Sequence, residues 1–200
     1  MTTRMKSGDR RAAIVDAAIH LFAEKGFRGA TTRELAAASG VTEPILYQHF
    51  ETKNDLYSAI IEAKSQQGQQ QGAELLALQE SGDDRAFFRF LGNLLLERYE
   101  DDPDFMRLLL FSALERHEFA ERFFERQVQG FFTLVAGYIQ RRIDAGAFRP
   151  MDSQAAARGF TGMLSYHGLV RLLFGDRVAW SRAQVVEEMV ESFLHGVCVR

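Results

Sequence analysis

The sequence predicts an all-α fold in which an N-terminal three-helix domain joins a helical bundle, with about nine helices in total. Three observations support this prediction. Apolar residues recur at the three- and four-residue spacing of amphipathic helices along most of the chain. No stretch of any length alternates apolar and polar residues as a half-buried strand would. Residues that cap or break helices, such as Gly26, Gly40, Pro103 and Gly146, divide the chain into segments of helical length.

The composition is that of a globular protein whose charge is unevenly distributed. Hydrophobic residues make up 46% of the chain and charged residues 26%. The net charge is −3, but residues 1–53 hold eight Lys/Arg and six Asp/Glu, and the rest holds sixteen and twenty-one. This distribution fits DNA binding at one end of the molecule and argues against nucleic acid covering the whole surface.

The cysteine content and hydropathy predict a cytoplasmic protein. Cys198 is the only cysteine, so no internal disulfide is expected. No apolar run approaches the ~20 residues of a membrane helix, and the N-terminal residues lack the apolar core of a signal peptide.

The first helix is expected over residues 10–25, where Ile14 and Leu21 belong to an apolar set at helical spacing. Gly26 is expected to end this helix, because glycine readily adopts backbone angles that no helix allows. Phe27 is then expected to fill the core of the N-terminal domain.

Residues 31–50 predict two short helices joined by a tight turn. Thr31 and Glu34 have the spacing of a capping box, so a helix is expected to begin directly after Thr31. Gly40 is expected to take left-handed backbone angles in the turn. Thr42 is expected to cap the second helix.

The second of these helices is expected to present a polar and aromatic outer side. The residues that point outward are Glu43, Pro44, Tyr47, Gln48 and His49. Aromatic and hydrogen-bonding side chains on a helix held by a rigid partner suit the major groove of DNA. Spacing alone leaves an ordinary two-helix hairpin open as the alternative.

A long helix is expected over residues 53–80, with Thr52 and Asp55 as its capping pair. At 1.5 Å per residue it would span ~42 Å. Its Gln-rich middle contains Gly68 and Gly72, each of which costs a helix ~1 kcal/mol relative to alanine. We expect a flexible, mostly solvent-facing helical segment there, and a low-complexity linker is the alternative.

The remaining sequence predicts further helices and an unusual number of aromatic side chains. The expected helices cover residues 84–100, 103–114, 118–145, 153–174 and 181–197. Thirteen of the seventeen phenylalanines lie between Phe87 and Phe174. Adjacent pairs such as Phe87–Phe88 are not expected to face one core together, so some rings should line a cavity or an interface. A packed aromatic core is the alternative.

A motif in the N-terminal part carries a family resemblance. Tyr47-Gln48-His49-Phe50 is followed by Lys53 and Leu56, and is preceded by Gly40-Val41-Thr42, with Phe27 and Thr32 further back. This pattern, over roughly residues 10–60, resembles the DNA-binding domain of TetR-type transcriptional regulators. The rest of the chain resembles them only in length and helical layout. The family often has Ser-x-Gly at the start of its recognition helix, where this chain has Thr42-Glu43-Pro44, so no known operator sequence is carried over.

The resemblance implies a helix-turn-helix DNA-binding domain over residues 1–53 and a ligand-binding and dimerisation domain over residues 54–200. Phosphate contacts are expected from Thr32, Tyr47, His49 and Lys53, and base contacts from Thr42, Glu43, Pro44 and Gln48. The complete set of implied DNA-binding residues is Arg28, Thr32, Arg33, Thr42, Glu43, Pro44, Tyr47, Gln48, His49 and Lys53.

The resemblance also implies a ligand tunnel and a four-helix dimer interface in the second domain. The candidate ligand-binding residues are Phe90, Arg107, Phe111, Phe124, Gln127, Phe131, Met163, Tyr166 and His167. The candidate interface residues, from the last two helices, are Gly159, Met163, Val170, Phe174, Val186, Val190, Phe193 and Val197.

These implications predict a ligand-responsive regulator without catalytic residues, metal or cofactor. It is expected to bind a palindromic double-stranded operator as a homodimer and to repress until a small hydrophobic inducer releases it. The alternatives are an activator, a regulator that needs a co-ligand, and an adaptor that binds DNA through a partner. An enzyme is disfavoured because residues 117–121 place glutamate where a zinc-protease motif needs its second histidine. His195 and Cys198 lack a third catalytic group.

Overall fold

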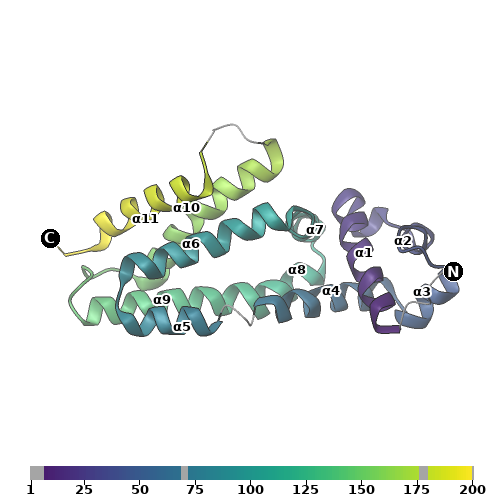
Figure 1. The fold of residues 1–200 in the computed structure, drawn as a ribbon, viewed down its shortest axis with the longest axis horizontal. Helices are drawn as coiled ribbons and strands as arrows, with labels where there is room; N and C mark the ends of the chain where they lie inside the picture. The colour runs from purple at the N-terminus through teal and green to yellow at the C-terminus, as the bar shows by residue number, and fades with distance from the viewer. Residues whose placement is uncertain (1–6, 69–71, 176–179, 200) are drawn as a thin grey trace. The chain divides into compact units, whose positions relative to one another are not determined.

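The computed structural model describes residues 7–68, 72–175 and 180–199, and within them the chain is helical apart from short connections (Figure 1). The only pairing of strand type in these ranges is an isolated bridge between Phe148 and Cys198. The all-α prediction is therefore confirmed. The α-helices are α1 (Ser7–Gly29), α2 (Thr32–Ala38), α3 (Glu43–His49), α4 (Lys53–Gly68), α5 (Gly72–Ser81), α6 (Asp84–Asp101), α7 (Pro103–Leu114), α8 (Glu118–Phe123), α9 (Gln129–Asp144), α10 (Ser153–Phe174) and α11 (Arg182–Val197).

Two predicted long helices are each described as two α-helices. The helix expected over residues 53–80 appears as α4 and α5, and the residues between them lie outside the described ranges. The helix expected over residues 118–145 is interrupted by a π-helical segment, Phe124–Val128, between α8 and α9. Counting each of these pairs once gives nine helices in the described ranges, the number predicted.

Most other helix boundaries agree with the predicted ranges, and two further caps appear in the structure. Gly26 has a φ of 68° inside α1, which confirms that it interrupts the first helix. The Asp83 side chain accepts a hydrogen bond from the Ala86 N–H at the start of α6. The Ser181 side chain does the same for Gln184 at the start of α11. These side chains satisfy N–H groups that the first helical turn leaves without a partner.

The chain forms two compact units. The first unit consists of α1–α4 together with α7 and α8, and the second consists of α5, α6 and α9–α11. The sequence did not indicate that α7 and α8 pack with the N-terminal helices. The functional boundary expected between residues 53 and 54 stays a prediction.

An aromatic cluster forms part of the core of the first unit. The Phe27 ring lies 4.6 Å from the Tyr57 ring and 4.2 Å from the His117 ring, measured between centroids. Phe119 packs edge-on against Tyr57 at 4.6 Å. Phe27 is partly buried and packs into this cluster, which joins α1, α4, α8 and the residue before α8.

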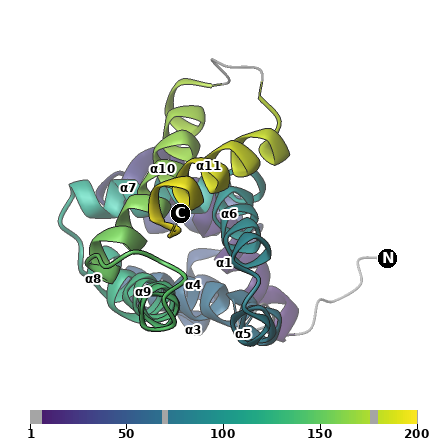
Figure 2. The same ribbon diagram turned by 90° about the vertical axis from the view of Figure 1, so that its left-hand side faces the viewer.

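The core of the second unit corrects the expectation for adjacent phenylalanines. Phe87 and Phe88 are both fully buried in the same core. Phe87 stacks on Tyr138 of α9 at 3.7 Å, whereas Phe88 packs against Phe160 of α10 at 4.8 Å. Helices on several sides of α6 make this possible, and Figure 2 shows α10 and α11 next to each other in this unit. An adjacent pair therefore does not by itself indicate a cavity.

Candidate nucleic-acid interface

The turn between α2 and α3 is built by local hydrogen bonds. The Thr31 hydroxyl oxygen accepts from the Glu34 N–H at 3.2 Å, and the Glu34 carboxylate accepts from the Thr31 N–H at 3.0 Å, which completes the capping box. Gly40 has a φ of 65° in the turn, in the left-handed region that favours glycine. Thr42 occupies the N-cap position of α3, but its side chain makes no capping hydrogen bond, which corrects the expectation for that residue.

Glu34 also joins the end of α1 to the start of α2. Its carboxylate lies 2.6 Å from the Lys25 ammonium. This contact, followed by the hydrogen bonds from Thr31, lowers the pKa of Glu34 to about 2. The carboxylate therefore remains ionised well into acid and holds two elements of the first unit together.

The outer side of α3 carries a contiguous set of exposed candidate residues. Thr42, Pro44 and Gln48 are exposed, and the Tyr47 side chain is 48% exposed. Leu46, on the opposite side, is buried against the core. Tyr47 and Gln48 lie three and four residues after Pro44, so the three share one side of the helix.

Glu43 and Thr32 face each other within the candidate interface. The Thr32 hydroxyl donates to the Glu43 carboxylate at 3.1 Å, and both residues are partly buried. This hydrogen bond ties the first turn of α2 to the first turn of α3. It leaves the carboxylate with further acceptor capacity toward a base edge.

The remaining predicted DNA-binding residues lie in different environments. Arg28 near the end of α1 and Arg33 on α2 are exposed, and His49 at the end of α3 is partly buried. Lys53 is partly buried, and its ammonium donates to the backbone carbonyls of Phe27 and Ala30, each at 2.9 Å. The Lys53 ammonium thus holds the connection between α1 and α2 in addition to any contact with DNA.

Lys53 belongs to a cluster that the sequence analysis missed. Its ammonium lies 4.4 Å from the centroid of the Phe27 ring and interacts electrostatically with Glu115. Burial lowers the pKa of Lys53 and of His117. The His117 Nδ1 accepts a hydrogen bond from the Phe119 N–H at 3.2 Å, so this histidine caps α8.

Glu115 lies directly against the connection between α1 and α2. A Cβ atom added to Gly26 would lie 2.9 Å from the Glu115 Oε1. The segment after α7 therefore touches the same connection that Lys53 holds. Only the pairing of distant segments reveals this contact, and no local sequence pattern indicates it.

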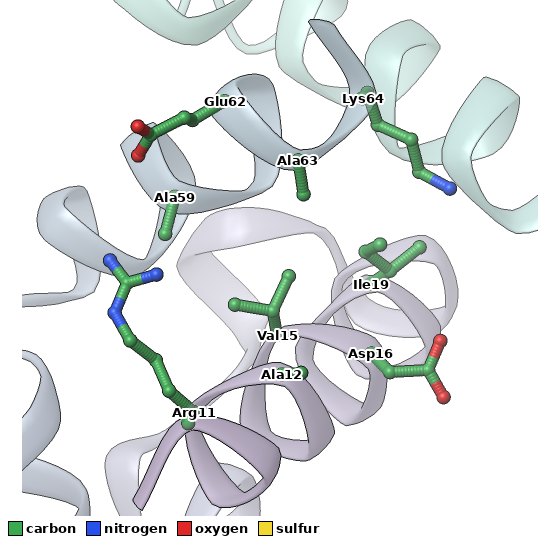
Figure 3. Close-up of a pocket in the computed structure, with 10 residues that line it drawn as sticks. Arg11, Ala12, Val15, Asp16, Ile19, Ala59, Glu62, Ala63 and Lys64 are labelled. Atoms are coloured by element: carbon green, nitrogen blue, oxygen red, sulfur yellow. The ribbon is translucent and has the colours of Figure 1, made fainter. Parts of the chain in front are cut away.

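A surface groove in the first unit runs between α1 and α4 (Figure 3). Its volume is about 470 Å³. Val15 and Ile19 of α1 and Ala59 and Ala63 of α4 form its apolar floor, and its edges carry both positive and negative side chains. None of the predicted site residues lines this groove.

The predicted ligand-binding residues are divided between the two units. Arg107 and Phe111 are exposed and belong to α7 of the first unit, where Arg107 pairs with Asp104 at 2.9 Å. In the second unit, Phe90, Phe131, Met163 and His167 are partly buried, whereas Phe124 and Tyr166 are exposed. The Gln127 side chain lies outside the described residues.

The predicted dimer residues divide by helix. Val186, Val190, Phe193 and Val197 of α11 are buried in the core of their own unit, so they do not face outward. On α10, Gly159 and Phe174 are exposed, and Met163 and Val170 are partly buried.

An exposed apolar stripe on α10 contains residues that the sequence analysis did not assign to the interface. Tyr166 is 71% exposed and Phe174 is 61% exposed, with the exposed Leu173 beside them. Gly159 and Gly162 continue the stripe, and no atom lies within 4 Å of a Cβ built on either. Helical spacing from Gly159 through Tyr166 to Leu173 would have indicated this stripe.

Arg98 of α6 is a further residue that the sequence analysis missed. It is partly buried, and burial lowers the pKa of its guanidinium. Its spacing from Phe87, Leu91 and Leu94 was the available signal, because residues four, seven and eleven positions apart share one side of a helix.

The described residues give no sign of a metal site or a membrane span. No group of three or more histidine, cysteine or acidic side chains is arranged to hold a metal ion among the residues whose side chains are described. In the same ranges, no helix is sufficiently long and apolar to cross a bilayer.

Comparison with known proteins gives a consistent result for both parts of the chain. Residues 14–60 match the sequence profile of bacterial regulatory proteins of the tetR family, and residues 98–196 match that of the AefR-like transcriptional repressor C-terminal domain. The uncharacterized HTH-type transcriptional regulator YvkB of Bacillus subtilis is 25% identical over 185 residues, which cover 92% of this chain and 95% of YvkB.

Two further similarities extend beyond the N-terminal part. The nucleoid occlusion factor SlmA of Marinobacter nauticus is 32% identical over 152 residues, which cover 75% of each chain. The structure of AibR in complex with isovaleryl coenzyme A and operator DNA has a similar fold, with a TM-score of 0.71 and 20% identity, and the match covers 92% of this chain and 97% of AibR.

Proposed function

Because the chain belongs to the TetR family of DNA-binding transcriptional regulators, we propose that it represses transcription by binding a palindromic operator as a homodimer. A small hydrophobic molecule, bound in the second unit, releases it. The observation that carries the proposal is the exposed side of α3, on which Pro44, Tyr47 and Gln48 lie together. Binding to chromosomal DNA would place the protein in the cytoplasm.

In this proposal α3 enters the major groove, and its residues divide between base and backbone contacts. Gln48 pairs with an adenine through its amide, and Pro44 packs on a thymine methyl group. Thr42 and Glu43 contact neighbouring base edges. Tyr47 and His49 contact phosphates, together with Thr32 and with Arg28 and Arg33, whose exposed guanidinium groups suit the backbone.

Lys53 has two roles in the proposal. Its ammonium holds the backbone carbonyls of Phe27 and Ala30. It also stands at the first turn of α4, where free backbone N–H groups favour a phosphate. A single residue thus fixes the position of the DNA-binding helices and contributes to the electrostatic field they present.

The homodimer follows from the need for two recognition helices. One seven-residue helix reads few bases, whereas two related by two-fold symmetry read half-sites ~34–36 Å apart. The exposed apolar stripe on α10 supports an interface there, because Tyr166, Leu173 and Phe174 together expose more apolar surface than single scattered residues do. The partly buried Val170 lies on the same helix and completes this surface.

Release by a ligand requires that ligand and operator weaken each other reciprocally. The relative AibR has been seen with isovaleryl coenzyme A and operator DNA in one complex, which supports a small-molecule ligand for this chain. Phe90, Phe131, Met163 and His167 are the predicted ligand residues whose partial burial in the second unit suits this role.

Selection of binding sites from random duplex DNA tests the proposal. The wild-type protein is expected to enrich a palindromic motif, and the Tyr47→Ala, Gln48→Ala double variant is expected to lose it. The Arg158→Gln variant, altered on an exposed residue of α10, serves as the control and keeps the motif. An enriched sequence without two-fold symmetry would contradict binding as a symmetric homodimer. Activation of a reporter placed behind the selected operator would contradict repression.

A further inference from the structure

Arg98 is a partly buried cation that no carboxylate among the described side chains pairs with. Among the residues whose side chains are described, no hydrogen bond or ion pair reaches its guanidinium. The other partly buried arginines described in the second unit are each paired with a carboxylate: Arg142 with Asp84, Arg171 with Glu100 and Arg182 with Glu97. Arg98 therefore departs from the pattern of its own unit.

The side of α6 that carries Arg98 is turned away from Glu100, and Asp84, on nearly the same side, lies fourteen residues or ~21 Å before Arg98 and pairs with Arg142. Gly92 and Tyr99 lie against Val186 of α11 and Gly168 of α10. Helical periodicity places Arg98 instead in line with Leu94, Leu91 and Phe87, which are buried. That side of α6 is directed toward α9, because Phe87 stacks on Tyr138.

The same geometry brings Arg98 level with the π-helical segment. Asp84 pairs with Arg142, and Phe87 stacks on Tyr138, so α6 and α9 run in opposite directions (Figure 1). Arg98 lies about eleven residues, or ~16 Å, beyond Phe87. Eleven residues before Tyr138 along the chain is position 127, which lies within the π-helical segment Phe124–Val128. Single π-helical turns within α-helices occur frequently at functional sites.

An unpaired guanidinium in such a position is costly, and the residue has no means of relieving the cost by itself. Arginine keeps its proton at any pH that a folded protein tolerates. Partial burial removes hydration from the charge, and without a partner anion this destabilises the folded chain. Burial correspondingly lowers the pKa of Arg98. A bound anion would remove the penalty.

We propose that Arg98 binds the oxyanion group of a hydrophobic organic anion, such as a long-chain carboxylate, whose apolar part packs on Phe131 and Met163. These two side chains are partly buried and pack against the core of the second unit. The inference rests on the proposed function, since it names the chemical class of the ligand in that proposal. The guanidinium forms two parallel hydrogen bonds to the oxyanion, a geometry that lysine does not reproduce.

Titration with a matched pair of fluorescent probes tests this inference. The probes are 11-(dansylamino)undecanoic acid and its methyl ester, which share one apolar body and differ in charge. The full-length wild-type protein is expected to bind the acid at least about tenfold more tightly than the ester, because a charged hydrogen bond is lost with the ester. Arg98→Gln is expected to remove this preference by weakening the acid alone, and Arg98→Lys to restore part of it.

A control on the same helix separates charge in general from charge at this position. Arg89 is exposed and pairs with Glu187 on the outer surface. Arg89→Gln is therefore expected to leave both titrations unchanged. Thermal unfolding gives a second readout: the acid raises the Tm of the wild type more than the ester does, and Arg98→Met raises the Tm of the ligand-free protein.

Three results would overturn the inference. These are equal affinity of the wild type for acid and ester, an equal loss of both in Arg98→Gln, and the absence of saturable binding of either probe. Each preparation is also titrated with the selected operator duplex. If the wild type binds the operator but does not prefer the acid to the ester, only the assignment of an anion to Arg98 is wrong. Failure of operator binding removes the proposed function, while the probe titrations still decide the role of Arg98.

Discussion

At the residue scale, Lys53 shows how one side chain can serve both the fold and the interface. Its ammonium donates to two backbone carbonyls in the connection between α1 and α2. Without it, those carbonyls lose a charged donor, which costs ~1–3 kcal/mol when the group left behind is buried. A phosphate contact would contribute differently, because it would appear in the salt dependence of DNA binding.

The salt dependence of operator binding in Lys53→Met separates these contributions. If the ammonium acts only within the protein, the variant binds more weakly and the slope of log K against log salt is unchanged. A phosphate contact would reduce the slope by ~0.9. We expect a reduced slope together with a lowered free energy of unfolding, since the proposal gives Lys53 both roles. Arg33→Gln is the control, and it is expected to reduce the slope without lowering stability, because Arg33 is exposed.

Arg116 illustrates a local conformational cost. Its φ of 52° makes it the only described residue other than glycine in the left-handed region. The N–H of the next residue, His117, donates to the Ser112 carbonyl at 2.8 Å and so closes the end of α7. Helix ends with this hydrogen-bond pattern usually have glycine at the position that Arg116 occupies.

Replacing Arg116 with glycine is expected to stabilise the protein by about 1 kcal/mol, because glycine takes left-handed angles without the penalty of a Cβ atom. Urea unfolding measures the change. The matched control is Ala113→Gly, an exposed helical position in α7, which is expected to destabilise by ~0.5–1 kcal/mol. Destabilisation by Arg116→Gly would show that the arginine side chain outweighs the backbone cost.

His117 predicts a pH dependence. Burial lowers its pKa below the ordinary value of 6.5, and Lys53 and Arg122 act in the same direction against Glu115 and Glu118. The unfolded chain therefore binds the proton more readily than the folded chain. Stability is fully present above pH 6.5 and declines as the pH falls below that value. Protonation at Nδ1 would also remove the acceptor for the Phe119 N–H.

The His117→Asn variant isolates this effect. Asparagine caps helices well but does not titrate, so it keeps the start of α8 and removes the proton. Urea unfolding at a series of pH values below 6.5 is expected to show a shallower loss of stability in the variant than in the wild type. Parallel curves would show that His117 does not contribute to the acid sensitivity.

At the element scale, two glycines with nearly the same backbone angle lie in different surroundings. Gly26 and Gly40 have φ values of 68° and 65°. A Cβ atom on Gly26 would approach the Glu115 Oε1 to 2.9 Å, whereas one on Gly40 would meet nothing within 4 Å. The first position therefore combines backbone strain with a contact from the segment that follows α7, and the second has backbone strain alone.

Alanine at each position measures the two costs. Gly40→Ala is expected to destabilise by ~1–2 kcal/mol from the left-handed backbone alone. Gly26→Ala is expected to cost more, because its ψ of 174° lies in a region that is almost restricted to glycine, and adding Glu115→Ala is expected to remove only the part that comes from the side-chain contact. A double-mutant cycle gives the interaction between positions 26 and 115 directly. Additive effects would mean that the Glu115 carboxylate simply moves aside.

The sequence predicted those elements whose signals are local. Capping pairs such as Thr31–Glu34 and Thr52–Asp55 predicted helix starts that the structure reproduces, because each pair bonds within one turn. The π-helical segment escaped prediction because its five residues give no distinct signal within a longer helical pattern. Membership of α7 and α8 in the first unit was also unpredictable, since it depends on contacts such as Phe27–His117 between distant segments.

In the candidate site, too, the residues with a local sequence signal were predicted and the others were not. The outward set on α3 could be read from helical spacing next to a recognisable turn, so its exposed residues were identified in advance. Candidate ligand residues were chosen mainly as aromatic, and the structure distributes them between two units. Arg98 was overlooked because an arginine in an apolar row looks like an ordinary surface cation until its lack of a carboxylate is seen.

At the scale of the whole molecule, the proposed function assigns operator reading to the first unit, and dimerisation and ligand sensing to the second. Specificity in this account comes from α3, and symmetry comes from the stripe on α10 that contains Tyr166 and Phe174. The central claim is that side chains on α3, Gln48 foremost, read individual base pairs. General affinity for DNA would not establish it, because phosphate contacts supply that without sequence information.

A double-mutant cycle between protein and DNA tests this claim most directly. The affinities of the wild type and of Gln48→Ala are measured for the selected operator and for one in which the same base pair is replaced in both half-sites. We predict that Gln48→Ala costs ~1–3 kcal/mol per half-site on the selected operator and close to nothing on the altered one. Equal losses on both duplexes, at every operator position, would show that Gln48 does not read bases and would contradict the account.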